Sequence, residues 1–147
     1  MSDLFTVPPA EFHRELPARL DVIESLTNEL TAWAEPLGVP ASVLARMGLM
    51  LDELFTNIVL YGYKKQPGQV EVDATLADRV LTLSLIDFAF AYDPLQTPET
   101  DTTLGLDDRE IGGLGVQFVR RMADAVSYRR IGHKGREANA LTLVKRF

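Results

Sequence analysis

The stretch LMLDELFTNIVLYGY, residues 49–63, decides the interpretation of this chain. Almost all of it is apolar, so we expect a helix that is buried around most of its circumference. Glu53 and Asn57 interrupt it four residues apart, and side chains at that spacing project from one helix face. A carboxylate beside a carboxamide packs poorly in a core but suits a base held next to a metal-bound phosphate. The alternative is a polar stripe that faces solvent together with Asp52 and Thr56.

The composition is that of an ordinary globular protein. The 147 residues are 46% apolar and 24% charged, as expected for one domain with a sizeable core. A net charge of −6 argues against a binder of nucleic acid or anionic membranes, since both need a basic surface. The absence of cysteine excludes thiolate and disulfide chemistry, and two histidines are too few for a histidine-rich metal site. No membrane-length apolar run or signal peptide is visible, so we expect a cytoplasmic location.

Periodicity predicts the order of elements. We expect a short strand at residues 4–7 and a helix at residues 10–35, kinked at Pro17, before the helix that carries Glu53. After that helix we expect, in order, strands 69–76 and 79–87 joined by an Ala77-Asp78 turn, a polar loop 94–111, a helix 116–124, and strands 125–131 and 139–146. This order predicts one α+β domain over residues 1–147, a two-layer sandwich whose mixed sheet is covered on one face by helices.

Asp87 ends a strand on the face that also carries Leu81, Leu83 and Leu85. That face should point into the core, where an unpaired carboxylate costs several kcal/mol. One interpretation is that Asp87 accepts a hydrogen bond from a ligand amine, such as the exocyclic amino group of adenine. The other is a strand-end aspartate that contacts backbone N–H groups of its own turn.

A glycine cluster, Gly112-Gly113-Leu114-Gly115, leads directly into a predicted helix. Free amides and the helix dipole make such a turn an anion site, and glycine lets a ligand approach the backbone closely. The cluster is neither a dinucleotide fingerprint, because Phe118 takes the third glycine position, nor a Walker A loop. The alternative is a flexible loop end.

The basic pairs Arg120-Arg121 and Arg129-Arg130 are expected to be solvated, with contact to a phosphate or a partner as the alternative. His13 and His133 lie in polar segments, where we also expect solvated side chains.

Together and in this order, the motifs resemble the GHKL ATPase superfamily, whose fold histidine-kinase catalytic domains and gyrase-type ATPases share. Glu53-x-x-x-Asn57 resembles its N box, Asp87-Phe88-Ala89 lies where it has Asp-x-Gly, and Gly113-Leu114-Gly115 matches its second glycine box. The stretch 111–124, with residues 92–94 before it and 141–146 after it, looks most like the small anti-sigma-factor serine kinases. The resemblance covers nearly the whole chain.

The resemblance implies that Mg-ATP is the cofactor. Asn57 would be the Mg²⁺ ligand, an oxygen donor suited to a hard cation. Glu53 would be the general base for a serine hydroxyl or water, and Asp87 would bind the adenine amine. The roles implied for the remaining residues are phosphate binding by the amides of Gly112, Gly113, Leu114 and Gly115, an ATP lid at residues 94–111, and support of the adenine by Thr142. These few residues would be enough for phosphoryl transfer, because that reaction needs mostly positioning and charge neutralisation.

Ala89 departs from the superfamily pattern, which has glycine there. Alanine adds a methyl group and disfavours positive φ, so its effect is either mild or a narrowed adenine pocket. We expect the protein to bind ATP weakly.

The resemblance implies a serine/threonine protein kinase of a bacterial partner-switching system. Its substrate would be an anti-sigma-factor antagonist protein, a sigma factor is a candidate sequestered partner, and a homodimer is a candidate assembly. The alternative is a partner-binding module that keeps the fold without catalysis: Ala89 favours it, whereas retention of Glu53 favours the enzyme. A third interpretation, a regulatory domain of a larger sensor kinase, is the one that we expect least. No dimerisation-and-phosphoacceptor helix precedes the predicted domain.

Overall fold

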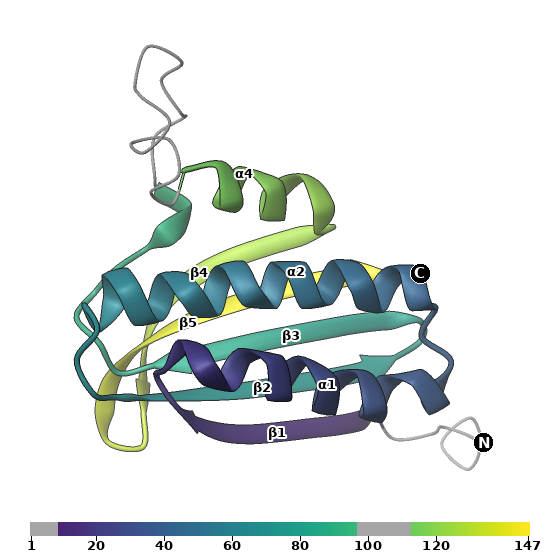
Figure 1. Ribbon diagram of the computed structural model, residues 1–147, viewed down its shortest axis with the longest axis horizontal. Helices are drawn as coiled ribbons and strands as arrows, with labels where there is room; N and C mark the ends of the chain where they lie inside the picture. Colours follow the sequence, from purple (N-terminus) through teal and green to yellow (C-terminus); the bar gives the residue numbers. More distant parts are fainter. Residues whose placement is uncertain (1–8, 97–112) are drawn as a thin grey trace.

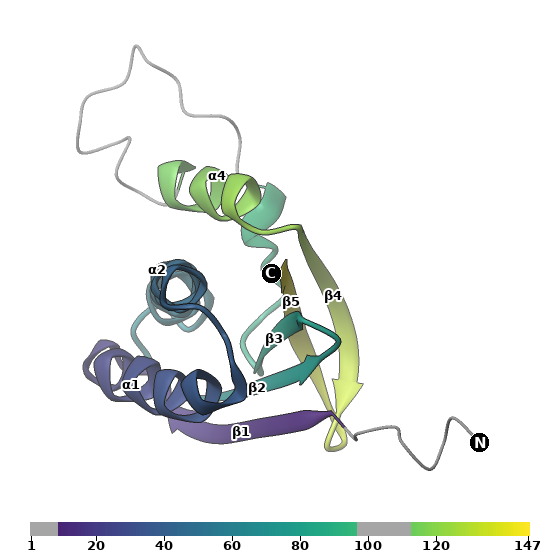
Figure 2. The same cartoon turned by 90° about the vertical axis from the view of Figure 1, so that its right-hand side faces the viewer.

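The computed structural model describes residues 9–96 and 113–147, and shows a sheet with helices on one face (Figures 1 and 2). The strands are β1 (Ala10–Pro17), β2 (Gln69–Ala77), β3 (Val80–Asp87), β4 (Ala125–His133) and β5 (Arg136–Arg146), and the helices are α1 (Ile23–Ala34), α2 (Ala41–Asn57) and α4 (Gly113–Met122). In Figure 2, all three helices lie on the same side of the curved sheet. The α+β two-layer prediction is confirmed, while the strand expected at residues 4–7 lies outside the described residues.

The five strands are ordered β1-β2-β3-β5-β4, and every neighbouring pair is antiparallel. The expectation of a mixed sheet is therefore wrong. Two of the pairs are hairpins, and a tight turn can join only antiparallel strands. Asp78 and Arg79 form the first turn with φ of 52° and 62°, as the right-handed twist of a two-residue hairpin demands. This turn lies one residue later than expected, because Ala77 still pairs with Val80.

The first eight residues of the predicted helix at residues 10–35 form a strand instead. Phe12 and Leu16 are four residues apart, a spacing that puts them on one face of a strand as well as of a helix. In the sheet they lie opposite Ala74 and Val70 of β2. The helical part begins only with a 3₁₀ turn at Leu20–Val22, which leads into α1.

The core lies between α1, α2 and the inner face of the sheet. Its largest fully buried side chains come from these elements: Leu26 and Leu30 of α1, Met47, Met50, Leu51, Leu54 and Phe55 of α2, and Leu81, Leu83, Leu85 and Leu143 of the sheet. The buried helix predicted around Glu53 and the leucine face predicted for β3 are both confirmed. Among the described helices, none is long and apolar enough to cross a membrane.

The C-terminal end of α2 widens into a π-helical turn, Ile58–Gly62. Such turns often occur beside functional sites. In Figure 1, this end of α2, the end of β3 and the start of α4 all lie at the same end of the molecule. The fold therefore gathers the segments that carry the sequence motifs.

Candidate functional site

Glu53 and Asn57 lie on the inner side of α2 and contact each other. The Asn57 amide donates a hydrogen bond from Nδ2 to Glu53 Oε1 over 3.3 Å. Asn57 is only 2% exposed, and Glu53 is partly buried. Asp52 and Thr56 form a separate pair, in which the Thr56 hydroxyl donates to Asp52 over 3.1 Å. The four polar residues are thus two pairs, of which the Glu53–Asn57 pair faces inward, and a single solvent-facing stripe is excluded.

Gly115, in the first turn of α4, lies directly against the Glu53 carboxylate. A Cβ atom added at residue 115 would overlap the carboxylate carbon and both of its oxygens. The structure thus brings two of the predicted motifs together across the α2–α4 contact. Gly113 begins α4, with the Leu114 backbone in the same turn, whereas Gly112 lies outside the described residues. A helix N-terminus presents free N–H groups, so this turn can receive an anion beside Glu53.

The environment of Glu53 favours its protonated form. Burial raises the pKa of the Glu53 carboxyl above its ordinary value, and the nearby negative charge of Asp52 raises it further. The hydrogen bond from Asn57 acts in the opposite direction, because it stabilises the carboxylate. A carboxylate with a raised pKa is a stronger base once it is ionised.

Asp87 ends β3 with its side chain buried at 3% exposure. Its Oδ1 atom accepts hydrogen bonds from the Ala89 backbone N–H over 3.0 Å and from Asn139 Nδ2 over 2.9 Å. Within residues 9–96 and 113–147, no hydrogen bond to Oδ2 is found. Burial raises the pKa of Asp87, while the two hydrogen bonds and the charge of Arg130 lower it. Asp87 therefore makes the turn contact through Oδ1, and its Oδ2 has no donor among the described residues.

Ala89 takes its place without backbone strain. It is not among the described residues with positive φ, so this backbone does not require glycine. The Ala89 methyl packs toward the end of α2, where a Cβ built on Gly62 would lie 3.6 Å from it in ordinary contact.

Asn139 and Arg130 complete the surroundings of Asp87, and the sequence interpretation missed both. Asn139 of β5 lies opposite Asp87 of β3 on one side and Arg130 of β4 on the other. Arg130, expected to be solvated, donates from Nη1 to the Ala89 carbonyl over 2.9 Å and to Asn139 Oδ1 over 3.0 Å. The signal in the sequence was a polar side chain at residue 139, which shares its strand face with Leu141 and Leu143.

Thr142 does not join the other predicted site residues. It lies opposite Ser84 and Ser127, on the sheet face that points away from the helices. Side chains alternate between faces along a strand, and Leu141 and Leu143 take the inner positions on either side of it. The expectation that Thr142 supports a bound adenine is therefore wrong.

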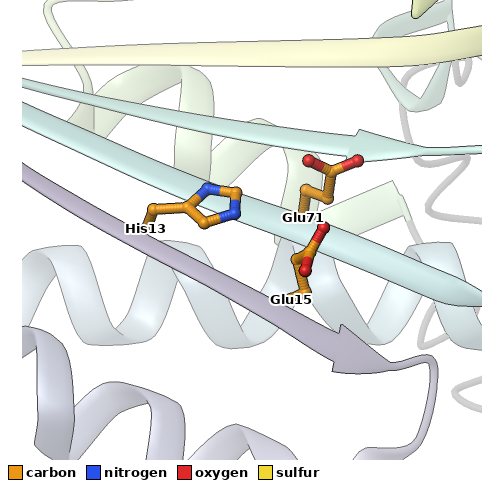
Figure 3. Close-up of side chains that lie close together, drawn as sticks. All are labelled: His13, Glu15 and Glu71. Atoms are coloured by element: carbon orange, nitrogen blue, oxygen red, sulfur yellow. The ribbon is translucent and has the colours of Figure 1, made fainter. Parts of the chain in front are cut away.

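A second group of polar side chains, His13, Glu15 and Glu71, gathers on this outer face (Figure 3). It is an ion-pair cluster. Lys134, in the β4–β5 turn, contacts Glu15 over 2.7 Å and the buried Glu71 over 3.2 Å, and His133 contacts Glu71 over 3.1 Å. A lysine ammonium already bridges the two carboxylates. We therefore interpret the cluster as a set of ion pairs that hold this turn against strands β1 and β2.

Comparison with known proteins gives the following relationships. The family model of the histidine kinase-like ATPase domain matches residues 16–145. The serine/threonine-protein kinase BtrW of Bordetella bronchiseptica is 28% identical over 116 residues, covering 76% of this chain and 82% of that protein.

Two solved structures share the fold. The RsbU and RsbW domains of Rv1364c from Mycobacterium tuberculosis match 95% of this chain with a TM-score of 0.63 and 20% identity, and this chain spans 33% of that longer one. A chain of the SiaB–SiaC complex from Pseudomonas aeruginosa matches with a TM-score of 0.61 and 16% identity, covering 90% of this chain and 88% of that one. At these identities the two structures support the fold alone.

Proposed function

This chain belongs to the histidine kinase-like ATPase domain family, and on that premise we propose that it is a Mg-ATP-dependent serine/threonine protein kinase. The proposed substrate is a small anti-sigma-factor antagonist protein, and the proposed setting is the cytoplasm of a bacterial cell. The observation that carries the proposal is the contact between Glu53 and Gly115, because it places a base beside the N-terminal amides of a helix.

The residues present fit Mg-ATP. Gly115 lets the Glu53 carboxylate lie directly against the first turn of α4, and Asp87 Oδ2 is a buried acceptor without a donor among the described residues. The buried Asn57 has a carboxamide oxygen of the kind that Mg²⁺ takes as a ligand. Asn57 would therefore hold the metal ion, the first amides of α4 would hold phosphate oxygens, and Asp87 would accept from the adenine amine. Bound Mg²⁺ would neutralise phosphate charge.

Glu53 performs the proton transfer in this proposal. Its carboxylate would take the proton of an attacking serine hydroxyl, and the Asn57 amide and the Gly115 backbone fix its position. The raised pKa supports this role, since a base acts best when its pKa approaches the working pH.

The protein partner is inferred from relatives. BtrW is named a serine/threonine-protein kinase, which supports a hydroxyl-bearing protein as the phosphate acceptor. The solved SiaB–SiaC structure is a complex of two proteins, and a protein partner is proposed for this chain by analogy with it. A sigma factor and a second copy of this chain are proposed partners on the sequence resemblance alone.

A partner-binding module without catalysis is the second candidate function, and Ala89 is the residue that favours it. Its unstrained φ and its packing toward Gly62 weaken that argument, since the methyl is accommodated at the helix end.

Transfer of label from radiolabelled Mg-ATP to candidate antagonist proteins encoded nearby tests the proposal. The native chain should label a serine or threonine, and Glu53→Gln should transfer about 100-fold more slowly, as expected for loss of a general base. Glu11→Gln, which removes an exposed carboxylate from β1, is the matched control and should transfer at the native rate. Equal transfer by native and Glu53→Gln chains would remove Glu53 as the base.

A further inference from the structure

Asn139 has an unusually complete set of hydrogen bonds for a side chain that is 2% exposed. Its Nδ2 atom donates to Asp87 Oδ1 and to the Phe90 carbonyl, each over 2.9 Å, and more weakly to the Ala89 carbonyl over 3.4 Å. One amide nitrogen therefore holds both the end of β3 and the carbonyls of Ala89 and Phe90 beyond it.

The other end of the same amide is held from β4 and from the segment that follows β3. Asn139 Oδ1 accepts from the Tyr128 hydroxyl over 2.5 Å, from Arg130 Nη1 over 3.0 Å and from the Tyr92 backbone N–H over 3.4 Å. Because a guanidinium and a backbone amide can only donate, while a carboxylate and carbonyls accept, the network fixes which end of the amide is oxygen. The side chain has a single orientation.

This orientation determines how many acceptors Asp87 offers to a ligand. Asn139 and the Ala89 N–H both engage Oδ1, which leaves Oδ2 as the oxygen without a donor among the described residues. Adenine presents one exocyclic amine at its pairing edge. Guanine presents two adjacent N–H groups, which are best met by both oxygens of a carboxylate. A carboxylate with one oxygen already engaged fits the single amine.

We propose that Asn139 is a positioning residue that sets the base preference of the nucleotide site, holding Asp87 so that one oxygen meets adenine and guanine is disfavoured. The inference rests on the proposed function, because it assumes that Asp87 binds a purine. In this proposal Asn139 acts through Asp87 and through the carbonyls of Ala89 and Phe90, and not by contact with the base.

A pH dependence follows, since Asp87 must be ionised to accept the amine. The charged and titratable groups around it are Arg130 and Tyr128 of β4 and Tyr63 beyond the π-helical turn. Of these, Arg130 favours the ionised form. Binding to the native chain should therefore weaken as the pH falls and Asp87 takes up a proton. In Asn139→Asp a second carboxyl faces Asp87, and two such groups share one proton. That variant should also lose affinity as the pH rises and both groups ionise.

The test is calorimetric titration of the native chain, Asn139→Asp and Thr142→Val with Mg-ADP and with Mg-GDP, each at several pH values. The native chain should prefer ADP. Asn139→Asp should reduce that preference about tenfold, the effect of losing one charge-assisted hydrogen bond, and should show the added alkaline loss. Thr142→Val, on the same strand but the opposite face, should match the native chain.

Tyr128→Phe is a milder second variant, because it removes only one donor to Asn139 Oδ1. It should lower the preference for ADP by about threefold, and it decides the matter if Asn139→Asp does not fold. A native chain that binds ADP while these variants keep its affinity, base preference and pH profile would overturn the inference and leave the proposed function standing. A native chain that binds neither nucleotide would instead overturn the proposed function.

Discussion

The carboxylate of Glu53 occupies the space that a side chain at Gly115 would need. The surfaces of helix α2 and the first turn of α4 are therefore complementary at this contact. Here the proposed base lies beside a helix N-terminus that can bind an anion. In Gly115→Ala, the new methyl group would push the Glu53 carboxylate aside.

We expect Gly115→Ala to slow label transfer about 100-fold, the scale of loss that follows a displacement of about 1 Å in a reacting group. The free energy of unfolding should fall by no more than about 1–3 kcal/mol, because the long glutamate side chain can move. Gly132→Ala is the matched control, since a Cβ there meets no atom within 4 Å. Native transfer rates in Gly115→Ala would show that the observed Glu53 position is not the catalytic one.

Glu53 also predicts the pH dependence of catalysis. Only the ionised carboxylate can accept a proton, so the transfer rate should rise with pH through a Glu53 pKa that lies above the ordinary glutamate value. Asp52→Asn removes a negative charge that raises this pKa, so the rise should move to lower pH. Single-turnover rates across the pH range measure the shift. A rise that stays in place in Asp52→Asn, or moves to higher pH, would contradict the assignment of the titrating group to Glu53.

Ala89 makes a prediction about nucleotide affinity and stability together. Ala89→Gly should lower the free energy of unfolding by about 1 kcal/mol, because glycine is more flexible in the unfolded chain and a buried methyl is lost. Since the native backbone carries alanine without positive φ, Mg-ADP affinity should change little. Calorimetry at millimolar nucleotide and urea denaturation give the two values. Binding by Ala89→Gly but not by the native chain would mark the protein as a degenerate module.

The ion-pair cluster on the outer sheet face predicts a pH-dependent contribution to stability. Lys134 lowers the pKa of Glu15 by a hydrogen bond and by its charge. A lowered carboxyl pKa contributes stability above the unfolded-state pKa, and that contribution disappears as the pH falls through the folded-state value. Lys134→Met should therefore lower the urea midpoint at pH 7 and have less effect at acidic pH. Lys65→Met, at an exposed position, is the control. An equal loss at both pH values would contradict this role.

The site residues that could be predicted correctly are those whose position depends on a pattern within a single helix or strand. The spacing of Glu53 and Asn57 and the leucine alternation before Asp87 each depend on one element, and the structure keeps both patterns. The error at Ala10–Pro17 has a local origin as well, because Phe12 and Leu16 satisfy helix and strand periods equally.

The prediction for Thr142 was wrong because this residue lies on the outer face of its strand. Residue 139 shares its parity with Leu141 and Leu143, whereas Thr142 does not, so alternation alone favoured Asn139 as the inward-facing residue. The pairing of Asn139 with Asp87 and Arg130 is different, since strand register depends on contacts between distant segments that no single stretch encodes.

The central claim is that Asn57, Asp87 and the start of α4 form one Mg-nucleotide site, and titration of ADP with and without Mg²⁺ tests it most directly. The native chain should bind ADP more tightly with Mg²⁺ than in chelator. Asn57→Ala should lose that Mg²⁺ advantage but still bind ADP, and Asp87→Asn should weaken ADP about tenfold under both conditions. No binding heat from the native chain at millimolar ADP, or a full Mg²⁺ advantage in Asn57→Ala, would contradict the claim.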